Sequence, residues 1–563
     1  MKNWRINLIF VFIILFGVAI ISKLFFLQVL NSDFYSAMAR GQHNIFPEIK
    51  GDRGKIYFQD KDGNLYPIAI NKTGKFCFVF LDKIGDKDEA AKILSETLNL
   101  DEDNLSSRFK KENANFLIVK EDLTPEEIKK LEDLQIFGLH LAEQKIREYP
   151  YQDFASHLIG FVNKDGAGQY GIEQYYNEIL SGKEQFLEGE RGPFGYLFFS
   201  DIEDLAGSDL ILTVDYNIQF QAEKLLDQAH ENLSIEEGQI IVIDPFSGKI
   251  LALAHFPRFD PNFYFAQDFA LFQNGAVQKL FEPGSVFKPI TMAGALNEGK
   301  ITPQTTYQDV GRIKIEGYWI ENYNQRVYPG EITMTEVLEK SINTGAVFAE
   351  SQLGHQKFLE YIESFKIFDK TGVDLPGEAF SLNEEFKKGY EINFATASFG
   401  QGIETTPLQL TRAFCAIANG GKLVKPYLVG KIIGGVEFQP EISNNNIISQ
   451  ETSSKLTAML VSVVKNGPYT KRARIPGYYV AGKTGTAQMS FGALGEAKSS
   501  YSDKTWQTFI GYAPAFDPKF LILVKLDNPQ AKTAEYSAVP IFHDLAKYII
   551  DYWQIAPDYN PET

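Results

Sequence analysis

The chain has 563 residues, a formal net charge of −17 and 44% hydrophobic residues. This length exceeds that of one typical domain and predicts two or more. The acidic balance argues against a nucleic-acid partner held by phosphate neutralisation. The two cysteines, Cys77 and Cys415, form no CxxC pair, which argues against a zinc or thioredoxin-like site. Each is expected to be a small buried apolar side chain.

The N-terminal segment predicts a membrane anchor. Lys2 and Arg5 precede an apolar stretch over residues 8–30 that contains one charge, Lys23. As a helix it would span about 34 Å, enough for a hydrocarbon core of roughly 30 Å. A cleaved signal peptide is the alternative, but the apolar run continues past the small residues 17–19, which favours an uncleaved anchor. The basic residues place the N-terminus in the cytoplasm and the rest of the chain outside.

The region after the anchor, residues 31–205, is rich in charge and mixed in pattern. Apolar and polar residues alternate over 51–71 around Asp62-Gly63, which predicts a hairpin. Residues 162–174 contain three glycines without the strand-then-helix setting of a phosphate loop. We therefore expect a turn-rich linker there.

Two stretches of the same region show helical periodicity, residues 88–100 and 123–134. Thr124 stands where it can cap the second of these helices. Both stretches are amphipathic, so each predicted helix has one face that must pack on a core.

From about residue 206 the pattern changes. Residues 209–229 read as a strand followed by a helix, and residues 238–256 as a hairpin around a turn at 245–248. Helical patterns fill the middle, and strand patterns return at 478–490, 506–516 and 520–529 before a final amphipathic helix at 540–553. Strands at both ends with helices between predict one antiparallel sheet flanked by helices, an α+β layout.

The first candidate site is FEPGSVFKPIT, residues 281–291. A helix is expected to begin at Ser285, and Lys288 follows one turn later on the same face. Alone, the stretch favours Ser285 as a helix cap and Lys288 as a solvated charge. The apolar neighbours of Lys288 predict that it is buried, which would favour its neutral form. A neutral amine beside a hydroxyl is a general base beside a nucleophile.

The second candidate is SINTG, residues 341–345, just after a short helix with a Thr333-x-x-Glu336 capping box. Ser341 can relay a proton, and Asn343 can both donate and accept hydrogen bonds. Alone, these residues are most simply an ordinary polar connection.

The third candidate is AGKTGTAQ, residues 481–488, on a strand pattern. Lys483 and Thr484 together suit a substrate carboxylate. The glycines on either side allow a ligand or another backbone to come close. If the strand lies at a sheet edge, the backbone N–H of Thr486 is free to bind an acyl oxyanion. Alone, this segment is as readily a β-bulge.

The three candidates in this order are typical of penicillin-binding proteins and serine β-lactamases. The chain resembles the class B penicillin-binding proteins, which are monofunctional peptidoglycan D,D-transpeptidases, and in particular their cell-division branch. The similarity covers nearly the whole chain. Besides the three motifs it rests on RGKI at 53–56, GIEQYYNEILSG at 171–182, TGVDLPGE at 371–378 and SFGQGIETTPLQL at 398–410.

Two positions depart from the family pattern. Residues 365–368 read FKIF where the family has Phe-Gly-x-Gly, and Gln185 replaces a common glycine. Neither position belongs to the three motifs, so the departures affect the local shape of the loops and the binding of any partner that recognises that shape.

The resemblance implies how acyl transfer proceeds. Ser285 attacks the D-Ala-D-Ala carbonyl of a stem peptide and releases the terminal D-Ala. Lys288 is the base for acylation, and Ser341 relays the proton toward the leaving amine. A second stem-peptide amine resolves the acyl-enzyme and forms the crosslink, and penicillins mimic the dipeptide and trap Ser285.

The resemblance also implies how substrate is held. Asn343 binds the donor peptide backbone, and Lys483 and Thr484 hold its terminal carboxylate. The backbone N–H groups of Ser285 and Thr486 form the oxyanion hole. Gly485, between the two threonines, completes the substrate-binding strand. No metal or organic cofactor is implied.

The implied architecture is a transpeptidase fold on an elongated N-terminal pedestal, with one transmembrane helix. The expected layout is a cytoplasmic tail (1–7), an anchor (8–30), a pedestal or dimerisation-type domain (31–205), a transpeptidase domain (206–556) and a C-terminal tail (557–563). The implied partners are peptidoglycan stem peptides, β-lactams as inhibitors, a membrane glycosyltransferase and other division or elongation proteins.

Other functions fit parts of the same pattern. A D,D-carboxypeptidase or β-lactamase shares the three motifs, with water as acceptor, and a β-lactamase needs a deacylating base that the sequence does not reveal. A bifunctional enzyme needs a glycosyltransferase domain before the pedestal, which these residues do not resemble. A non-catalytic scaffold of the division machinery is the third alternative, and the intact Ser285, Lys288 and Lys483 argue against it.

Overall fold

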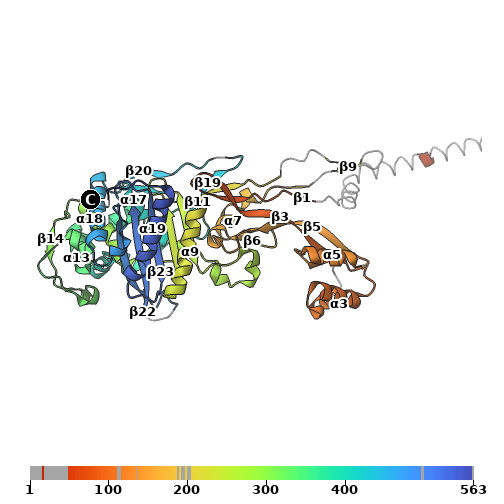
Figure 1. Ribbon diagram of the computed structural model, residues 1–563, viewed down its shortest axis with the longest axis horizontal. Coiled ribbons are helices and arrows are strands. Elements are labelled where there is room, and N and C mark those ends of the chain that lie inside the picture. Colours follow the sequence, from red (N-terminus) through yellow and green to blue (C-terminus); the bar gives the residue numbers. More distant parts are fainter. Residues whose placement is uncertain are drawn as a thin grey trace, which may run out of the picture. The chain divides into compact units, whose positions relative to one another are not determined.

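The computed structural model describes residues 15–17, 48–110, 116–134, 136–186, 189–191, 197–199, 205–435, 437–495 and 500–560. Their contacts divide the chain into two units, drawn in Figure 1: Met1–Asp52 with Gly182–Gly207, and Arg53–Ser181 with Ser208–Thr563. In the first unit, two antiparallel strand pairs form: β1 (Glu48–Lys50) with β8 (Glu184–Phe186), and β9 (Gly189–Arg191) with β10 (Leu197–Phe199). Within the described residues no helix is long and apolar enough to cross a membrane, and the expected anchor lies outside them apart from residues 15–17.

The second unit contains the predicted antiparallel sheet. Its five strands come from both ends of the region, in the order β13 (Ile250–Phe256), β12 (Glu237–Ile243), β23 (Phe520–Asp527), β22 (Tyr501–Ala513) and β21 (Ala481–Ser490). Every neighbouring pair is antiparallel. β21, which carries Lys483 and Thr484, lies at the edge, which is the condition that the oxyanion role of the Thr486 N–H required.

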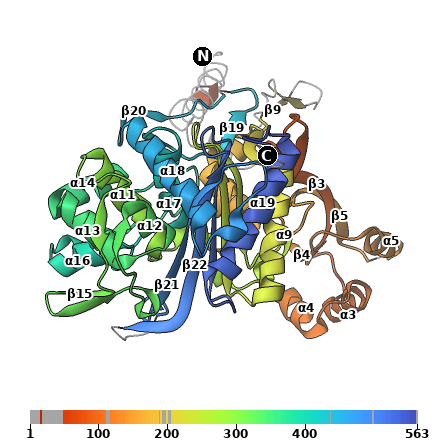
Figure 2. The same ribbon diagram turned by 60° about the vertical axis from the view of Figure 1, so that its left-hand side comes forward.

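Helices cover both faces of this sheet (Figure 2). α9 (Tyr216–Leu233) and α19 (Ala538–Trp553) pack on one face, and α11 (Lys288–Asn297), α17 (Pro407–Ala418) and α18 (Gln450–Asn466) on the other. Ile522 and Val524 of β23 belong to the core on the α9 and α19 face. Leu521 and Leu523 belong to the core on the opposite face. A strand buried on both faces reads as a continuous apolar run, as β23 does.

A second sheet joins the two predicted domains. It runs in the order β19 (Val429–Ile432), β11 (Leu210–Asp215), β2 (Ile56–Gln59), β3 (Leu65–Phe80) and β4 (Phe116–Lys120), with β5 (Leu139–Glu148) also on β3. The predicted hairpin is present, with Gln59 opposite Leu65. β11 pairs in parallel with β2 and antiparallel with β19, so this sheet contains strands from both sides of residue 206.

The far half of β3, with β4 and β5, carries a small core of its own. α3 (Lys87–Leu98), α4 (Glu102–Phe109) and α5 (Pro125–Asp133) pack there around buried residues that include Leu94 and Phe109. The predicted cap is present: Thr124 and Glu127 form a reciprocal capping box at the start of α5. Cys77 in this core and Cys415 in α17 are both buried and free, as expected.

The remaining helical elements lie mostly between β13 and β21. The α-helices are α6 (Ser156–Ile159), α8 (Asn177–Leu180), α10 (Gly275–Gln278), α12 (Met334–Glu339), α13 (Asn343–Leu353), α14 (His355–Ser364), α15 (Glu384–Lys387) and α16 (Glu391–Ala397). The 3-10 helices are η2 (Pro261–Ala266), η3 (Phe269–Phe272), η4 (Gly284–Phe287), η5 (Tyr323–Gln325), η6 (Lys471–Ala473) and η7 (Ala534–Tyr536).

The remaining short strands form pairs. They are β14 (Thr306–Gln308) with β17 (Glu331–Thr333), β15 (Arg312–Ile315) with β16 (Tyr318–Glu321), and β18 (Lys422–Val424) with β20 (Ile442–Asn446).

The prediction of a linker at residues 162–174 is wrong. The segment folds as a small hairpin, β6 (Phe161–Val162) with β7 (Gly168–Gln169), followed by α7 (Gly171–Tyr175). A Cβ on Gly168 would lie 1.8 Å from the carbonyl oxygen of Glu173, so the glycine permits a close backbone approach. Two of the glycines that suggested a loop, Gly168 and Gly171, are therefore sites of tight packing, and Gly166 lies in the hairpin turn.

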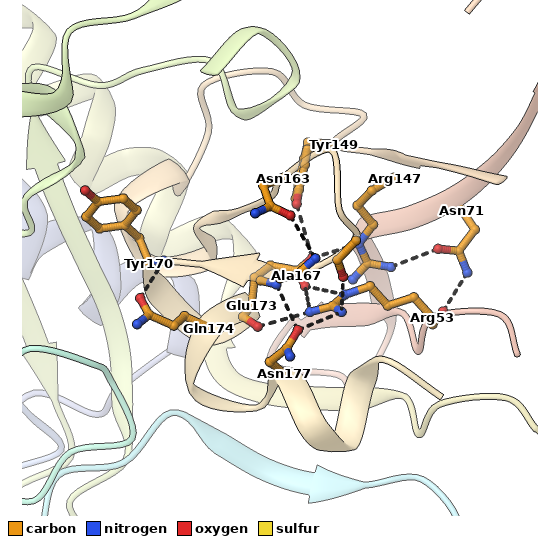
Figure 3. A network of polar contacts seen from close by, with 12 residues as sticks. Arg53, Asn71, Arg147, Tyr149, Asn163, Ala167, Tyr170, Glu173, Gln174 and Asn177 are labelled. Carbon is orange, nitrogen blue, oxygen red and sulfur yellow. Dashed lines mark hydrogen bonds and ion pairs between the residues drawn. The ribbon is translucent and has the colours of Figure 1, made fainter. Parts of the chain in front are cut away.

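That packing surrounds a buried ion-pair network, shown in Figure 3. The Glu173 carboxylate is fully buried and accepts from Arg53 Nε and Arg147 Nε, each at 2.7 Å. The Tyr149 hydroxyl donates to the same carboxylate at 3.2 Å, and Arg53 also donates to Asn177 Oδ1 at 3.0 Å. The RGKI and GIEQYY segments of the sequence thus meet through a compensated buried charge.

Candidate active site

Ser285 lies inside the 3-10 turn η4, which continues directly into α11. The residue before η4 is Pro283, and no side chain caps the turn. The cap that the stretch alone favours is therefore wrong, because Ser285 is the second residue of η4 and not the residue that precedes it. Its hydroxyl lies 3.0 Å from Lys288 Nζ.

Glycines allow three segments to meet at Ser285. Gly284 has φ +60°, a backbone region that favours glycine, and its N–H donates to the carbonyl of Gly400 at 2.9 Å. A Cβ on Gly400 would lie 2.2 Å from the Gly284 carbonyl oxygen. A Cβ on Gly485 would lie 2.8 Å from the Pro283 carbonyl oxygen. β21 and the SFGQG segment therefore pack directly on the turn of Ser285.

The SINTG segment approaches Lys288 from the other side. Lys288 Nζ donates to the Ser341 carbonyl at 2.7 Å and to Asn343 Oδ1 at 2.9 Å, and it lies 3.3 Å from Ser341 Oγ. Ser341 has φ +55°, which costs a non-glycine residue some strain. Asn343 is the first residue of α13, so the segment connects α12 to α13. Its contacts with Lys288 show that it is more than an ordinary polar connection.

The edge strand β21 completes the chain of polar atoms. Lys483 Nζ lies 3.0 Å from Ser341 Oγ and 3.1 Å from the Thr484 carbonyl oxygen. Ser341 Oγ therefore lies between Lys288 and Lys483, and short contacts link the Ser285 hydroxyl to Lys483.

Both lysines are buried, and none of the described carboxylates forms an ion pair with either of them. Lys288 is 0% and Lys483 1% exposed. Burial, with a further contribution from the charge of Lys483, holds the pKa of Lys288 well below its ordinary value. Burial alone lowers the pKa of Lys483 to about 7. The partners of Lys288 are neutral oxygens, so the site favours a neutral amine beside the Ser285 hydroxyl.

A cleft of about 430 Å³ opens onto these residues. Ser285, Ser341, Asn343, Thr484 and Thr486 line it. Lys288, Lys483 and Gly485 are not part of its wall. Residues of all three motifs predicted from the sequence thus line one cleft.

Comparison with known families agrees with this geometry. The family model for the penicillin binding protein transpeptidase domain matches residues 238–547, and that for the penicillin-binding protein dimerisation domain matches residues 48–196. The chain belongs to the class B penicillin-binding proteins. The resemblance seen in the sequence is confirmed.

Relatives of this penicillin-binding protein share its full architecture. Stage V sporulation protein D of Bacillus subtilis is 31% identical over 537 residues, covering 92% of this chain and 81% of the relative. Probable peptidoglycan D,D-transpeptidase PbpC of Pseudomonas aeruginosa is 30% identical over 534 residues, covering 94% and 91%. The crystal structure of penicillin binding protein 3 from Mycobacterium tuberculosis complexed with ampicillin superposes with a TM-score of 0.70 at 25% identity, covering 92% and 98%.

Several residues of the cleft wall were missed by sequence reasoning. They are Gly284, Tyr323, Lys340, Phe399, Gln401, Tyr469, Gln488, Thr505, Lys532, Thr533, Ala534 and Glu535. Adjacency to a motif could have identified Gly284, Lys340 and Gln488, and Phe399 and Gln401 stand in the SFGQG segment. The others come from segments outside the three motifs, among them β22, η5 and η7, and carry no local signal. Among the residues the structure describes, no group of three or more His, Cys, Asp or Glu side chains could hold a metal ion.

One departure from this penicillin-binding protein family's pattern has a structural explanation. Lys366 has φ +59° at the position where the family has the first glycine of Phe-Gly-x-Gly. The buried Arg412 donates to the carbonyl oxygens of Lys366, Asp369 and Lys370. These bonds stabilise the turn without a glycine. The other departure, Gln185, lies in β8.

Proposed function

We propose that this protein is a membrane-anchored serine D,D-transpeptidase that crosslinks peptidoglycan stem peptides through an acyl-enzyme. The observation that carries the proposal is the 3.0 Å contact between the Ser285 hydroxyl and a fully buried Lys288 with no carboxylate partner. The names of the relatives and the family of the catalytic domain support it. The segments that resemble the cell-division branch support a septal role.

In the proposed mechanism, neutral Lys288 takes the proton of Ser285 as the hydroxyl attacks the D-Ala-D-Ala carbonyl. The proton passes from Lys288 by way of Ser341 to the leaving amine, whose C–N bond breaks as D-Ala departs. Ser341 Oγ is suited to this relay because it lies within 3.3 Å of Lys288 Nζ and 3.0 Å of Lys483 Nζ. A second stem-peptide amine then attacks the acyl-enzyme and returns the proton to Ser285.

Substrate binding in this mechanism uses the cleft wall together with Lys483, which is buried beside it. Thr484 and Lys483 hold the terminal carboxylate, with Gly485 allowing the strand to lie close to the turn of Ser285. Asn343 binds the donor backbone. The N–H groups of Ser285 and Thr486 stabilise the oxyanion, a role for which one donor is worth about 10²–10³-fold in rate.

The test is mass spectrometry of the penicillin adduct. We expect one acyl group on the peptide that contains Ser285, and none in Ser285→Ala. Labelling of Ser285→Ala as strong as that of the parent would sink the nucleophile assignment and favour the scaffold alternative. Rapid turnover of penicillin would favour a β-lactamase, and release of D-Ala without crosslinking in the presence of acceptor a carboxypeptidase.

Residues 8–30 supply the proposed anchor, with the N-terminus in the cytoplasm and the catalytic region outside. A partner glycosyltransferase in the membrane follows from the same proposal. Deletion of residues 1–30 should move the protein from the membrane fraction to the soluble fraction. Retention in the membrane fraction would contradict a single N-terminal anchor.

A further inference from the structure

Helix α13, which begins with Asn343, has no cap of its own. The residue before it is Ile342, and no side chain of the helix's own flank accepts its first N–H groups. These groups have no partner within a helix and must find one elsewhere. Oδ1 of Asn322 accepts from the backbone N–H of Asn343 at 3.0 Å and of Thr344 at 3.1 Å. Asn322 follows strand β16, so the cap comes from a different segment.

Asp309 orients the amide of Asn322. Asn322 Nδ2 lies 2.9 Å and 3.1 Å from the two carboxylate oxygens of Asp309. A carboxylate only accepts hydrogen bonds, so the nitrogen must face Asp309 and the oxygen is left for the helix. A flipped amide would lose both sets of contacts. Asn322 and Asp309 are 3% and 7% exposed, so water does not replace these bonds readily.

Asp309 is itself held by further donors. Its carboxylate accepts from the N–H of Tyr328 at 2.8 Å, the N–H of Gly311 at 3.1 Å and the hydroxyl of Thr344 at 2.7 Å. Burial raises the pKa of Asp309, but these hydrogen bonds outweigh it, so the pKa lies below its ordinary value and the group is ionised at neutral pH. The carboxylate thus links residues 309–328 to the start of α13.

The same loop also holds the side chain of Asn343. Asn343 Nδ2 donates to the Glu321 carbonyl at 2.9 Å, while Asn343 Oδ1 accepts from Lys288 Nζ at 2.9 Å. Both the backbone and the side chain of Asn343 therefore rest on residues 321–322. A displacement of Asn322 would move a hydrogen-bond acceptor of Lys288.

We propose that Asn322, oriented by Asp309, is a positioning residue for acyl transfer. It caps α13 from outside the helix and so fixes Asn343 against Lys288 and the cleft. The β15–β16 hairpin that carries Asn322 is then part of the support of the reaction centre. This inference rests on the function proposed above.

The test is the rate of penicillin acylation of Asn322→Ala as a function of pH, in the full-length protein. We expect a fall of about 10–100-fold, since a displacement of about 1 Å can cost 10²-fold. We also expect the acid limb of the pH profile to move to lower pH. Asn343 Oδ1 stabilises the charged form of Lys288, and its withdrawal lowers the pKa of that amine further.

Asn419→Ala is the matched control. Asn419 is 8% exposed, donates to the Pro245 and Lys422 carbonyls at 2.8 Å each and accepts from the N–H of Lys422. It contacts none of the site residues. We expect a comparable fall in melting temperature, with the acylation rate and pH profile of the parent.

Two outcomes would overturn the inference: acylation of Asn322→Ala within twofold of the parent, or an equal loss in both variants without a shift of the pH profile. If Asn322→Ala does not fold, Asp309→Asn replaces it, because it keeps the volume while it disturbs the orientation of the Asn322 amide. It also weakens the other hydrogen bonds that Asp309 accepts. Its acylation should change in the same direction and by less, and an unchanged rate would count against the inference. A parent that penicillin does not acylate at all contradicts the proposed function instead.

Discussion

Two buried clusters of this protein contain basic side chains, and they are balanced in opposite ways. Around Glu173, Arg53 and Arg147 each donate to a carboxylate that is fully buried. Around Ser285, Lys288 and Lys483 are as deeply buried but meet neutral oxygens. The first cluster sets one carboxylate between two arginines, and the second has no carboxylate beside its two lysines among the described residues.

This difference indicates that the Glu173 cluster stabilises the fold, whereas the Ser285 cluster is suited to proton transfer. Paired charges fix the segments that carry them, because removal of either partner leaves a buried charge alone. Unpaired lysines cannot hold their protons well, which makes an amine available as a base. A carboxylate beside Lys288 would stabilise the ammonium and remove that base. The comparison can be tested by changing each cluster in turn.

The largest effect is expected from Lys288→Met. Loss of the general base should lower the rate of penicillin acylation by about 10²–10⁴-fold. The side chain is similar in size and no paired charge is broken, so the free energy of unfolding should change less than in Glu173→Gln. Stopped-flow acylation and urea unfolding measure the two quantities. Acylation within tenfold of the parent would assign the base elsewhere.

Glu173→Gln should have the opposite signature. It leaves Arg53 and Arg147 facing a neutral amide, and breaking such a pair costs about 3–5 kcal/mol. Acylation per folded molecule should equal that of the parent, because the network does not touch the cleft. Glu178→Gln, an exposed acid on α8, is the matched control and should unfold as the parent does. An equally small loss in both variants would mean that the network does not stabilise the fold.

Per unit of pH, the smallest effect is a pH dependence of stability. Burial lowers the pKa of Lys483 to about 7, against about 10.4 in an unfolded chain. Between these values only the unfolded state binds the proton, so the free energy of unfolding rises with pH by about 1.4 kcal/mol per unit. Stability is thus lost as the pH falls through this window, and the loss is complete below its lower end.

The measurement is urea unfolding from pH 7 to 10 in the parent and in Lys483→Met. The slope of the free energy of unfolding against pH should be smaller in the variant by the contribution of one proton, about 1.4 kcal/mol per pH unit. Lys224→Met, an exposed lysine on α9, should keep it. Equal slopes in the parent and Lys483→Met would show that Lys483 keeps its ordinary pKa in the folded protein.

Local patterns in the sequence were sufficient for much of the fold. Alternation predicted the hairpins of β2 with β3 and of β12 with β13, and periodicity predicted α3, α5 and α19. The capping box of α12 was visible in the spacing of Thr333 and Glu336. Each of these features depends on residues close together in the chain, so its physical cause can be read directly.

The site was predicted in the same way only in part. The motif residues followed from order and spacing, whereas the edge position of β21 is seen only in the structure. The partners of Glu173 did not, because Arg53, Arg147 and Glu173 are far apart in sequence and no periodicity links them. The capping of α13 by Asn322, which lies in a different segment, could not be predicted for the same reason.

The sequence by itself determined which side chains can react: a serine and a lysine one turn apart, a second serine with an asparagine, and a lysine with two threonines. The apolar neighbours of Lys288 predicted its burial, but only the tertiary structure decided that Lys483 is buried as well and that burial lowers the pKa values of both lysines. It also decided that glycines in residues 162–174 pack a core instead of forming a linker. Hydrogen bonding and desolvation depend on which groups are close in space, and groups that are close in space can be far apart in the sequence.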